Sequence, residues 1–104
     1  MGYNHCMKII QTTGAFNQWF AALRDKSIKT RIQVRIDRAS FGHFGDHKML
    51  AGGVSEMRLH FGAGYRLYFI EQGDEIIILL AGGDKSSQSN DIKLAVDLAK
   101  TLKG

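Results

Sequence analysis

The chain has 104 residues, of which 44% are hydrophobic, so it is long enough for one packed domain and too short for two. Fourteen lysines and arginines against ten aspartates and glutamates give a formal charge of +4, which favours polyanionic partners such as nucleic acid. A single cysteine, Cys6, excludes an intrachain disulfide. No secretory signal or apolar run of the roughly 20 residues that a membrane helix needs is visible, so we expect a cytoplasmic protein that does not enter membranes.

The first part of the chain predicts a strand followed by a helix. Met7–Gln11 has the length and apolar content of a short strand. Thr12 or Thr13 is placed to cap a helix, because a threonine hydroxyl can accept a hydrogen bond from the first free backbone amides. The apolar residues of that helix recur at helical spacing: Phe16, Trp19, Phe20 and Leu23.

Ser27 is placed to cap a second, basic helix. Its apolar stripe consists of Ile28, Ile32, Ile36 and Ala39, and its remaining faces carry Lys26, Lys29, Arg31, Arg35 and Arg38. Such a helix either lies along an RNA backbone or presents an ordinary solvated face. The excess of these cations over the one interior acid, Asp37, favours RNA contacts from Lys29, Arg31, Arg35 and Arg38.

Ser40–Asp46 has two glycines and no period, so it predicts a loop, and Lys48–Ala51 predicts a short edge strand. His43 and His47 are four residues apart in this region. The glycines disfavour a helix there, and neither an H-E-x-x-H motif nor a cysteine pair is present. The sequence therefore predicts no metal site and no cofactor.

The next segment predicts a β-hairpin with one charged face. Apolar and polar residues alternate along Ser55–Phe61 and again along Tyr65–Ile70, with Gly62–Gly64 as the turn. This pattern places a carboxylate, several cations and a phenol on one surface: Glu56, Arg58, His60, Arg66 and Tyr68. The surface is either a phosphate-binding site or a solvated sheet face whose charges pair across strands.

The last part of the chain predicts a buried strand and a helix. Glu75–Ala81 is almost wholly apolar, which indicates a strand covered on both faces inside the sheet. Lys85 follows Gly82-Gly83, and Ser86 or Ser87 is placed to cap the final helix, whose apolar positions are Ile92, Ala95, Val96, Ala99 and Leu102. The spacing of a P-loop is missing. The order of elements predicts one α+β domain with helices packed on a twisted, mainly antiparallel sheet.

Several segments together resemble the RelE/ParE toxin superfamily, and most of all its phage Gp49-like, HigB-type branch. The resemblance covers Met7 to about Leu102, and Met1–Cys6 is interpreted as an extension. The segments that carry it are Phe16–Trp19–Leu23-Arg24-Asp25, Arg31-Ile32, Arg35-Ile36, Gly53-Val54-Ser55-Glu56-Met57-Arg58, Phe61-Gly62-Ala63-Gly64-Tyr65-Arg66, Gly82-Gly83-Asp84-Lys85-Ser86-Ser87-Gln88 and Asp91-Ile92.

The resemblance implies the toxin of a type II toxin–antitoxin pair, silenced by a cognate antitoxin. RelE-like members cleave messenger RNA on the ribosome without a metal ion. By position, Arg66 corresponds to the arginine that contacts the scissile phosphate, Lys85 to a second stabilising basic residue, and Arg58 to a lysine. Glu56 falls where that branch has a lysine, and Asp91 falls near a tyrosine thought to assist proton transfer.

Metal-free RNA cleavage needs the 2′-hydroxyl deprotonated, the phosphorane charge stabilised and the leaving 5′-oxygen protonated. Arg58, Arg66 and Lys85 fit the second task, Glu56 is our hypothesis for the base, and Asp91 or a loop histidine for the acid. Further RNA contacts are expected from Lys48, His60 and Tyr68. Two alternatives remain open: a ParE-like inhibitor of DNA gyrase and a non-catalytic RNA-binding module.

Overall fold

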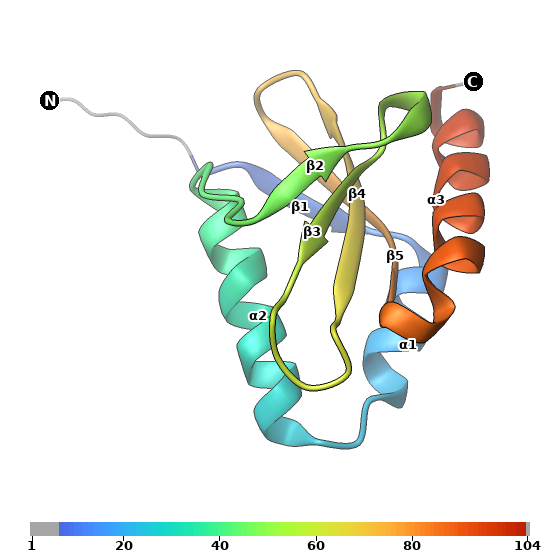
Figure 1. Cartoon of the computed structure of the whole chain (residues 1–104). Helices are drawn as coiled ribbons and strands as arrows, with labels where there is room; N and C mark the ends of the chain where they lie inside the picture. The colour runs from blue at the N-terminus through green and yellow to red at the C-terminus, as the bar shows by residue number, and fades with distance from the viewer. Residues whose placement is uncertain (1–6, 104) are drawn as a thin grey trace, which may run out of the picture.

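The computed structural model describes residues 7–103, so Met1–Cys6, the segment predicted to be an extension, lies outside the described part. The elements are β1 (Ile9–Thr12), α1 (Gly14–Ala22), α2 (Lys26–Ser40), β2 (His47–Met49), the 3-10 turn η1 (Ala51–Gly53), β3 (Ser55–Arg58), β4 (Arg66–Gln72), β5 (Ile76–Gly83), the 3-10 turn η2 (Lys85–Ser87) and α3 (Gln88–Lys103) (Figure 1). None of the described helices is long and apolar enough to cross a membrane.

The five strands form one sheet in the order β1-β5-β4-β3-β2. β1 runs parallel to β5, and the other neighbouring pairs are antiparallel. The apolar strand β5 lies inside the sheet, between β1 and β4, as its composition predicts. The predicted α+β class, with helices on a mainly antiparallel sheet and a C-terminal helix, is confirmed.

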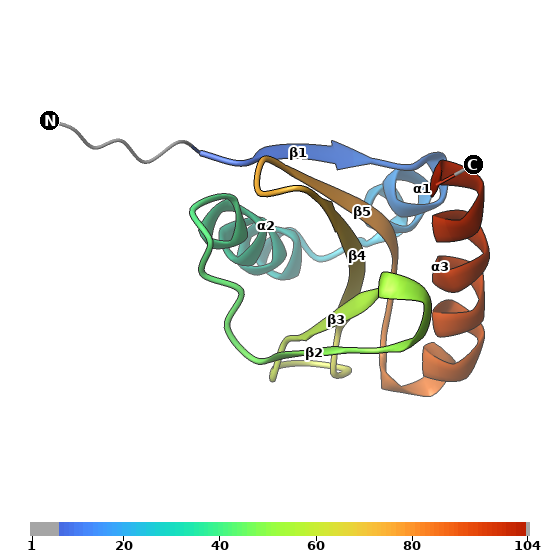
Figure 2. The ribbon, with the colours of Figure 1, turned by 90° about the horizontal axis from the view of Figure 1, so that it is seen from above.

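Helices cover both faces of the sheet, and each face has its own core. α2 and α3 lie on opposite faces when the molecule is viewed along the sheet (Figure 2). The core on the face of α1 and α2 contains Phe16, Ile32, Ile36, Ala39, Met57, Leu59, Leu67, Phe69, Ile77 and Leu79. The core beneath α3 contains Val54, Tyr68, Ile70, Ile78, Leu80, Ala81, Ala95 and Ala99.

α1 packs unusually close to the strand β5. A methyl group added at Gly82 would lie 2.2 Å from the Trp19 ring, a distance that side-chain carbons do not reach. A glycine is therefore required for this contact between helix and sheet. The Trp19 ring also lies 6.4 Å from the ring of Tyr65, so α1 reaches the end of the β3–β4 hairpin.

The helix caps agree with the sequence at one of three positions. Thr13 caps α1, as one of the two predicted threonines, and its hydroxyl accepts from the Phe16 amide. Ser27 does not cap α2, because the Asp25 carboxylate accepts from the backbone amide of Ser27 at 2.9 Å. A carboxylate is the stronger acceptor, so the helix begins two residues earlier than predicted.

The cap before α3 also differs from the prediction. Asp84, not Ser86 or Ser87, accepts from the backbone at the start of η2, and the Ser87 hydroxyl completes a capping box with it. The 3-10 turn η2 therefore precedes α3, which begins at Gln88. Leu102, predicted for the apolar stripe of this helix, is 43% exposed.

The strand β3 is shorter than the alternation predicts, and this decides which residues share its face. β3 ends at Arg58 instead of Phe61, and the chain turns through 61–64 before β4 begins at Arg66. Glu56 pairs with Tyr68 and Arg58 with Arg66 in the register of β3 and β4. These four residues therefore lie on the α3 side of the sheet, whereas His60 lies beyond the end of the strand.

Candidate functional site

The candidate site is centred on Glu56, a carboxylate with no exposed surface. The Gln88 side-chain amide, in the first turn of α3, donates to Glu56 Oε2 at 2.7 Å. The same oxygen lies 3.5 Å from Nε of Arg66, and Oε1 lies 3.9 Å from Nε of Arg58. One buried carboxylate thus faces two guanidinium groups.

The two guanidinium groups are fixed by further contacts on their other sides. Arg66 donates from Nη1 to the Gly64 carbonyl at 3.0 Å, and only 14% of its side chain is exposed. Arg58 lies 3.6 Å from Asp46 Oδ2, and 34% of its side chain is exposed. Arginine side chains lose substantial freedom when ordered, so these contacts orient both groups before any ligand arrives.

Lys85 joins the arginines through the tight turn of the hairpin. Its backbone amide donates to the Ala63 carbonyl at 3.2 Å. Gly64 has φ +73°, and a Cβ there would lie 3.3 Å from Cβ of Lys85 and 3.6 Å from Nη1 of Arg66. The exposed Lys85 and the half-buried Arg66 therefore flank the same glycine. The structure brings Arg58, Arg66 and Lys85, from three separate segments, to one end of the sheet.

Tyr68 lies in the interior behind this cluster, and Asp91 lies near it in the first turn of α3. The Tyr68 hydroxyl is fully buried, and it has no hydrogen-bond partner among residues 7–103. Burial raises the pKa of Tyr68 far above its usual value, and the charges of Glu56 and Asp91 raise it further. Asp91 accepts a hydrogen bond from the Ser87 hydroxyl at 2.5 Å and is half-buried. The prediction that Tyr68 contacts RNA is therefore wrong, because the ring is covered on its own sheet face.

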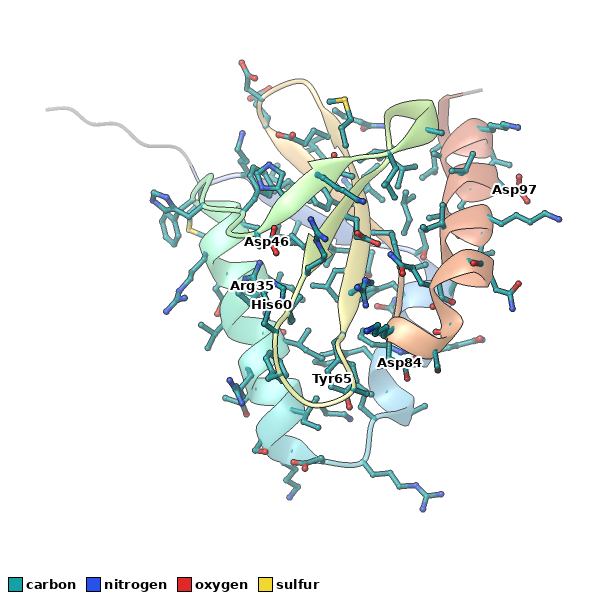
Figure 3. The ribbon with its side chains drawn as sticks, viewed as in Figure 1. Arg35, Asp46, His60, Tyr65, Asp84 and Asp97 are labelled. Carbon is teal, nitrogen blue, oxygen red and sulfur yellow. The ribbon has the colours of Figure 1, made fainter. Side chains whose placement is uncertain are left out.

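Asp46 connects Arg58 with His60, a link that no sequence pattern predicts. Oδ2 of Asp46 lies 2.5 Å from Nε2 of His60 and also faces Arg58. Arg35 lies near Asp46 and His60 (Figure 3). The hydrogen bond from His60 lowers the pKa of Asp46, and the positive charges of Arg58 and Arg35 add to this effect. His60 is 72% exposed at its side chain, so the imidazole is open to solvent beside Arg58, off the predicted sheet face.

Glu56 is poorly placed for the proton transfer that the sequence suggested. Its side chain is inaccessible, and its oxygens face Gln88, Arg58 and Arg66. A general base must reach the proton that it removes, to within hydrogen-bond distance or through one water. We therefore correct the expected role of Glu56 from general base to the group that orients the two arginines.

Some of the cations predicted to bind RNA contact other parts of the protein, and others are exposed to solvent. Arg35 donates to the backbone carbonyls of Arg58 at 3.0 Å and of Phe44 at 2.9 Å, so it fastens α2 to the sheet and is not available as predicted. Lys29 donates to the Ala21 carbonyl at 3.3 Å and lies over the Phe20 ring. Three of the predicted RNA-contacting cations are exposed: Arg31, Arg38 and, on the edge strand β2, Lys48.

The histidines near β2 do not form a metal-binding cluster. His47 Nδ1 lies 2.9 Å from the Gly45 carbonyl, and both His43 and His47 are exposed. Within the described residues, no three His, Cys, Asp or Glu side chains are grouped so that they could hold a metal ion.

Two residues of the site were missed by reasoning from sequence. Gln88 ends the G-G-D-K-S-S-Q segment, so the motif contained it without revealing its contact with Glu56. Asp46 ends a glycine-containing loop that has no periodicity, and no local signal marks it. Both contacts join segments that are distant in the sequence.

Comparisons with known proteins identify relatives of this chain and of its fold. An uncharacterized protein of Haemophilus influenzae is 45% identical over 93 residues, which cover 89% of this chain and 94% of that protein. The chain therefore belongs to the same family as that protein. No family model matches the sequence.

A solved structure of a mutant of the Escherichia coli toxin RelE in the free state superposes with a TM-score of 0.61 at 12% identity, covering 84% of this chain and 96% of that one. The fold is therefore RelE-like.

Proposed function

We propose that this protein is the toxin of a type II toxin–antitoxin system, of the HigB-type branch, and that it inhibits translation by cleaving messenger RNA on the ribosome. The observation that carries the proposal is the pair Arg58 and Arg66, oriented by one buried carboxylate and joined by Lys85 at the end of the sheet. The RelE-like fold supports the toxin assignment. The charge of +4 supports an RNA substrate.

In the proposed reaction the 2′-hydroxyl of the RNA attacks the adjacent phosphorus, and the bond from phosphorus to the 5′-oxygen breaks. Negative charge builds up on the non-bridging oxygens as the phosphorane forms. Arg58, Arg66 and Lys85 stabilise this charge, and the first two require little reorganisation because Glu56 already orients them. Side chains alone supply these interactions, so the proposed reaction uses no cofactor and no metal ion.

The proton transfers need a group that solvent and substrate can reach. The exposed imidazole of His60, oriented by Asp46 beside Arg58, replaces Glu56 as the proposed general base. A neutral imidazole nitrogen can accept the proton that a general base must remove. Asp91 remains the proposed source of the proton for the leaving 5′-oxygen, since it lies in the first turn of α3 at the same end of the sheet.

The proposed partners are the ribosome with its messenger RNA, in the cytoplasm, and a cognate antitoxin. Leu94 and Leu102 on α3 are 42% and 43% exposed, which gives an antitoxin apolar surface on this helix. A disordered antitoxin segment that folds on this helix would gain affinity over a wide contact area.

The test is to express the wild-type chain briefly and to map the 5′ ends of transcripts by primer extension, with Arg66→Ala as the control. New ends inside translated codons for the wild type, reduced at least about a hundredfold by Arg66→Ala, are expected. DNA damage without such cuts indicates the ParE-like alternative. Growth arrest or RNA binding without either effect indicates a non-catalytic module. Either of these two outcomes contradicts the proposal.

A further inference from the structure

A pocket lies between α2 and the segment that follows β3, separate from the cluster around Glu56. Its volume is about 390 Å³, and it is lined by Thr30, Arg31, Val34, Arg35, Arg38, His60 and Phe61. This volume falls within the range of small-ligand sites. We propose that the pocket seats one nucleotide of the substrate RNA, next to the nucleotide whose phosphate reaches Arg58 and Arg66. The inference rests on the proposed function and adds a subsite to it.

The walls offer a surface on which a base can stack. The guanidinium carbon of Arg31 lies 4.0 Å from the centre of the Phe61 ring, so a cation covers an aromatic face at the pocket. Val34, an apolar residue of α2 that lines the pocket, is 40% exposed, so its side chain is accessible to a ligand. Single-stranded RNA is bound through bases that stack on aromatic rings or on arginine planes. The pocket combines both kinds of surface with an apolar residue.

The charge around the pocket suits a phosphate group. Among the described residues that line it, three are arginines and none is acidic. Arg35 is fixed by two backbone carbonyls, so its charge stays in place, whereas Arg31 and Arg38 are exposed and can meet a ligand. Arginine suits phosphate because its planar group donates two parallel hydrogen bonds.

The pocket adjoins the arginine pair, and this favours RNA over an acidic peptide as the occupant. His60 lines the pocket, and its Nε2 contacts the same Asp46 oxygen that faces Nε of Arg58. A chain bound at Arg58 can therefore continue past His60 into the pocket. A nucleotide chain has a phosphate and a base at each step, which matches this succession of cationic and stacking surfaces.

The pocket is tested with Val34→Glu, which places a carboxylate among the arginines at a site that already faces solvent. Gln33→Glu is the matched control, because it makes the same charge change one residue away, at an exposed position outside the pocket. A short 2′-O-methylated RNA, which cannot undergo 2′-hydroxyl attack, serves as the probe in fluorescence anisotropy. We expect Val34→Glu to weaken binding about tenfold, the effect of losing one stacked base. Gln33→Glu is expected to stay within about twofold of the wild type.

A second pair of variants tests the pocket without adding an acid. The logarithm of the RNA affinity falls linearly with the logarithm of the salt concentration. Arg38→Ala is expected to make this slope shallower by about one unit, the change for the loss of one phosphate contact. Lys26→Ala removes the same charge from α2 outside the pocket and is expected to leave the slope unchanged. Circular dichroism and thermal unfolding establish that all four variants are folded.

The outcomes separate this inference from the proposed function. If the wild type cleaves messenger RNA but Val34→Glu and Gln33→Glu have the same KM and affinity, the pocket assignment is overturned and the proposed function stands. If Val34→Glu weakens only the binding of an acidic antitoxin peptide, the occupant is a protein and the assignment is likewise overturned. A wild type that cuts no transcript removes the proposed function, whatever the pocket binds.

Discussion

Two groups of arginines, on β3–β4 and on α2, differ in how firmly the protein orients them. Arg66 is 14% exposed at its side chain and contacts both Glu56 and the Gly64 carbonyl. Arg31 and Arg38 on α2 are exposed, and the guanidinium group of Arg31 lies over the face of the Phe61 ring. Pre-oriented charge stabilises a transition state, whereas mobile surface charge contributes mainly to affinity. Under the proposed function, the sheet arginines therefore take part in the chemistry and the arginines of α2 in RNA binding.

The largest expected effect separates the two groups directly. Arg66→Ala should lower kcat by about 10² to 10³, the range for removing one donor to a developing oxyanion, with little change in KM. Arg31→Ala should raise KM a few-fold and leave kcat unchanged, because an exposed cation contributes to RNA affinity and not to the chemical step. Single-turnover cleavage at varied protein concentration measures both constants. Equal effects of both substitutions on kcat would remove the distinction.

Glu56→Gln should show that the orientation of the arginines matters and not their presence alone. The amide leaves Arg58 and Arg66 without the negative charge that orients them, and we expect kcat to fall about tenfold to a hundredfold with KM nearly unchanged. The free energy of unfolding should also fall, because a buried partner of two cations is lost. Cleavage is measured below the melting temperature of the variant. A variant that is folded and fully active would contradict the proposed role of Glu56.

Arg35 sharpens the comparison, because it belongs to α2 but is engaged like the sheet residues. Its hydrogen bonds to the carbonyls of Arg58 and Phe44 predict that Arg35→Ala lowers the free energy of unfolding by about 2 kcal/mol. Urea denaturation measures this loss, and Arg38→Ala, three residues further along α2 but exposed, should change stability by less than about 0.5 kcal/mol. Equal stability of the two variants would show that Arg35 does not fasten α2.

The smallest effect is expected at Asp46, which couples His60 to Arg58. Asp46→Asn keeps the size of the side chain but removes its charge, and we expect kcat to fall a few-fold and its pH profile to shift, as for a general base that has lost its orienting partner. His60→Gln should abolish the rise of kcat with pH that an essential general base produces. Unchanged pH profiles for both variants would exclude His60 as the base.

The lowered pKa of Asp46 also predicts a pH dependence of stability. A carboxyl group whose folded pKa lies below its ordinary 3.8 contributes stability at pH values above 3.8, and this contribution is lost as the pH falls through the folded value. The wild type should therefore lose more stability than Asp46→Asn between pH 5 and pH 2, in urea titrations. Parallel curves for the two proteins would show that the ion pairs of Asp46 do not stabilise the fold.

Local patterns in the sequence were sufficient to predict the elements and their faces. The alternation from Ser55 onward placed Glu56 and Arg58 on one side of β3, and the register of the hairpin placed Arg66 beside them. The apolar run of β5 indicated its interior position. The predicted end of β3 lies three residues beyond its observed end at Arg58. Residues 59 and 60 continue the alternation of apolar and polar side chains but leave the strand before the turn at 61–64, and alternation alone does not reveal this.

The environment of the site depends on contacts between distant segments, so it was not predictable from local patterns. The burial of Glu56 and Tyr68 follows from the position of α3, whose Gln88 lies 32 residues from Glu56 in the chain. Asp46 and His60, whose side chains are in contact, are 14 residues apart in the chain. Exposure and pairing decide whether a carboxylate is a base or a partner of arginines, and neither property can be read from residue type and spacing.

The central claim is that Arg58 and Arg66 stabilise the charge that forms when a 2′-hydroxyl attacks the neighbouring phosphate. Analysis of the ends of the cleaved RNA tests it most directly, with wild-type protein and Arg66→Ala compared on the same ribosome-bound message. The account predicts a 2′,3′-cyclic phosphate and a 5′-hydroxyl from the wild type, formed at least about a hundredfold more slowly by Arg66→Ala. Ends that carry a 3′-hydroxyl and a 5′-phosphate, or wild-type rates for Arg66→Ala, would contradict it.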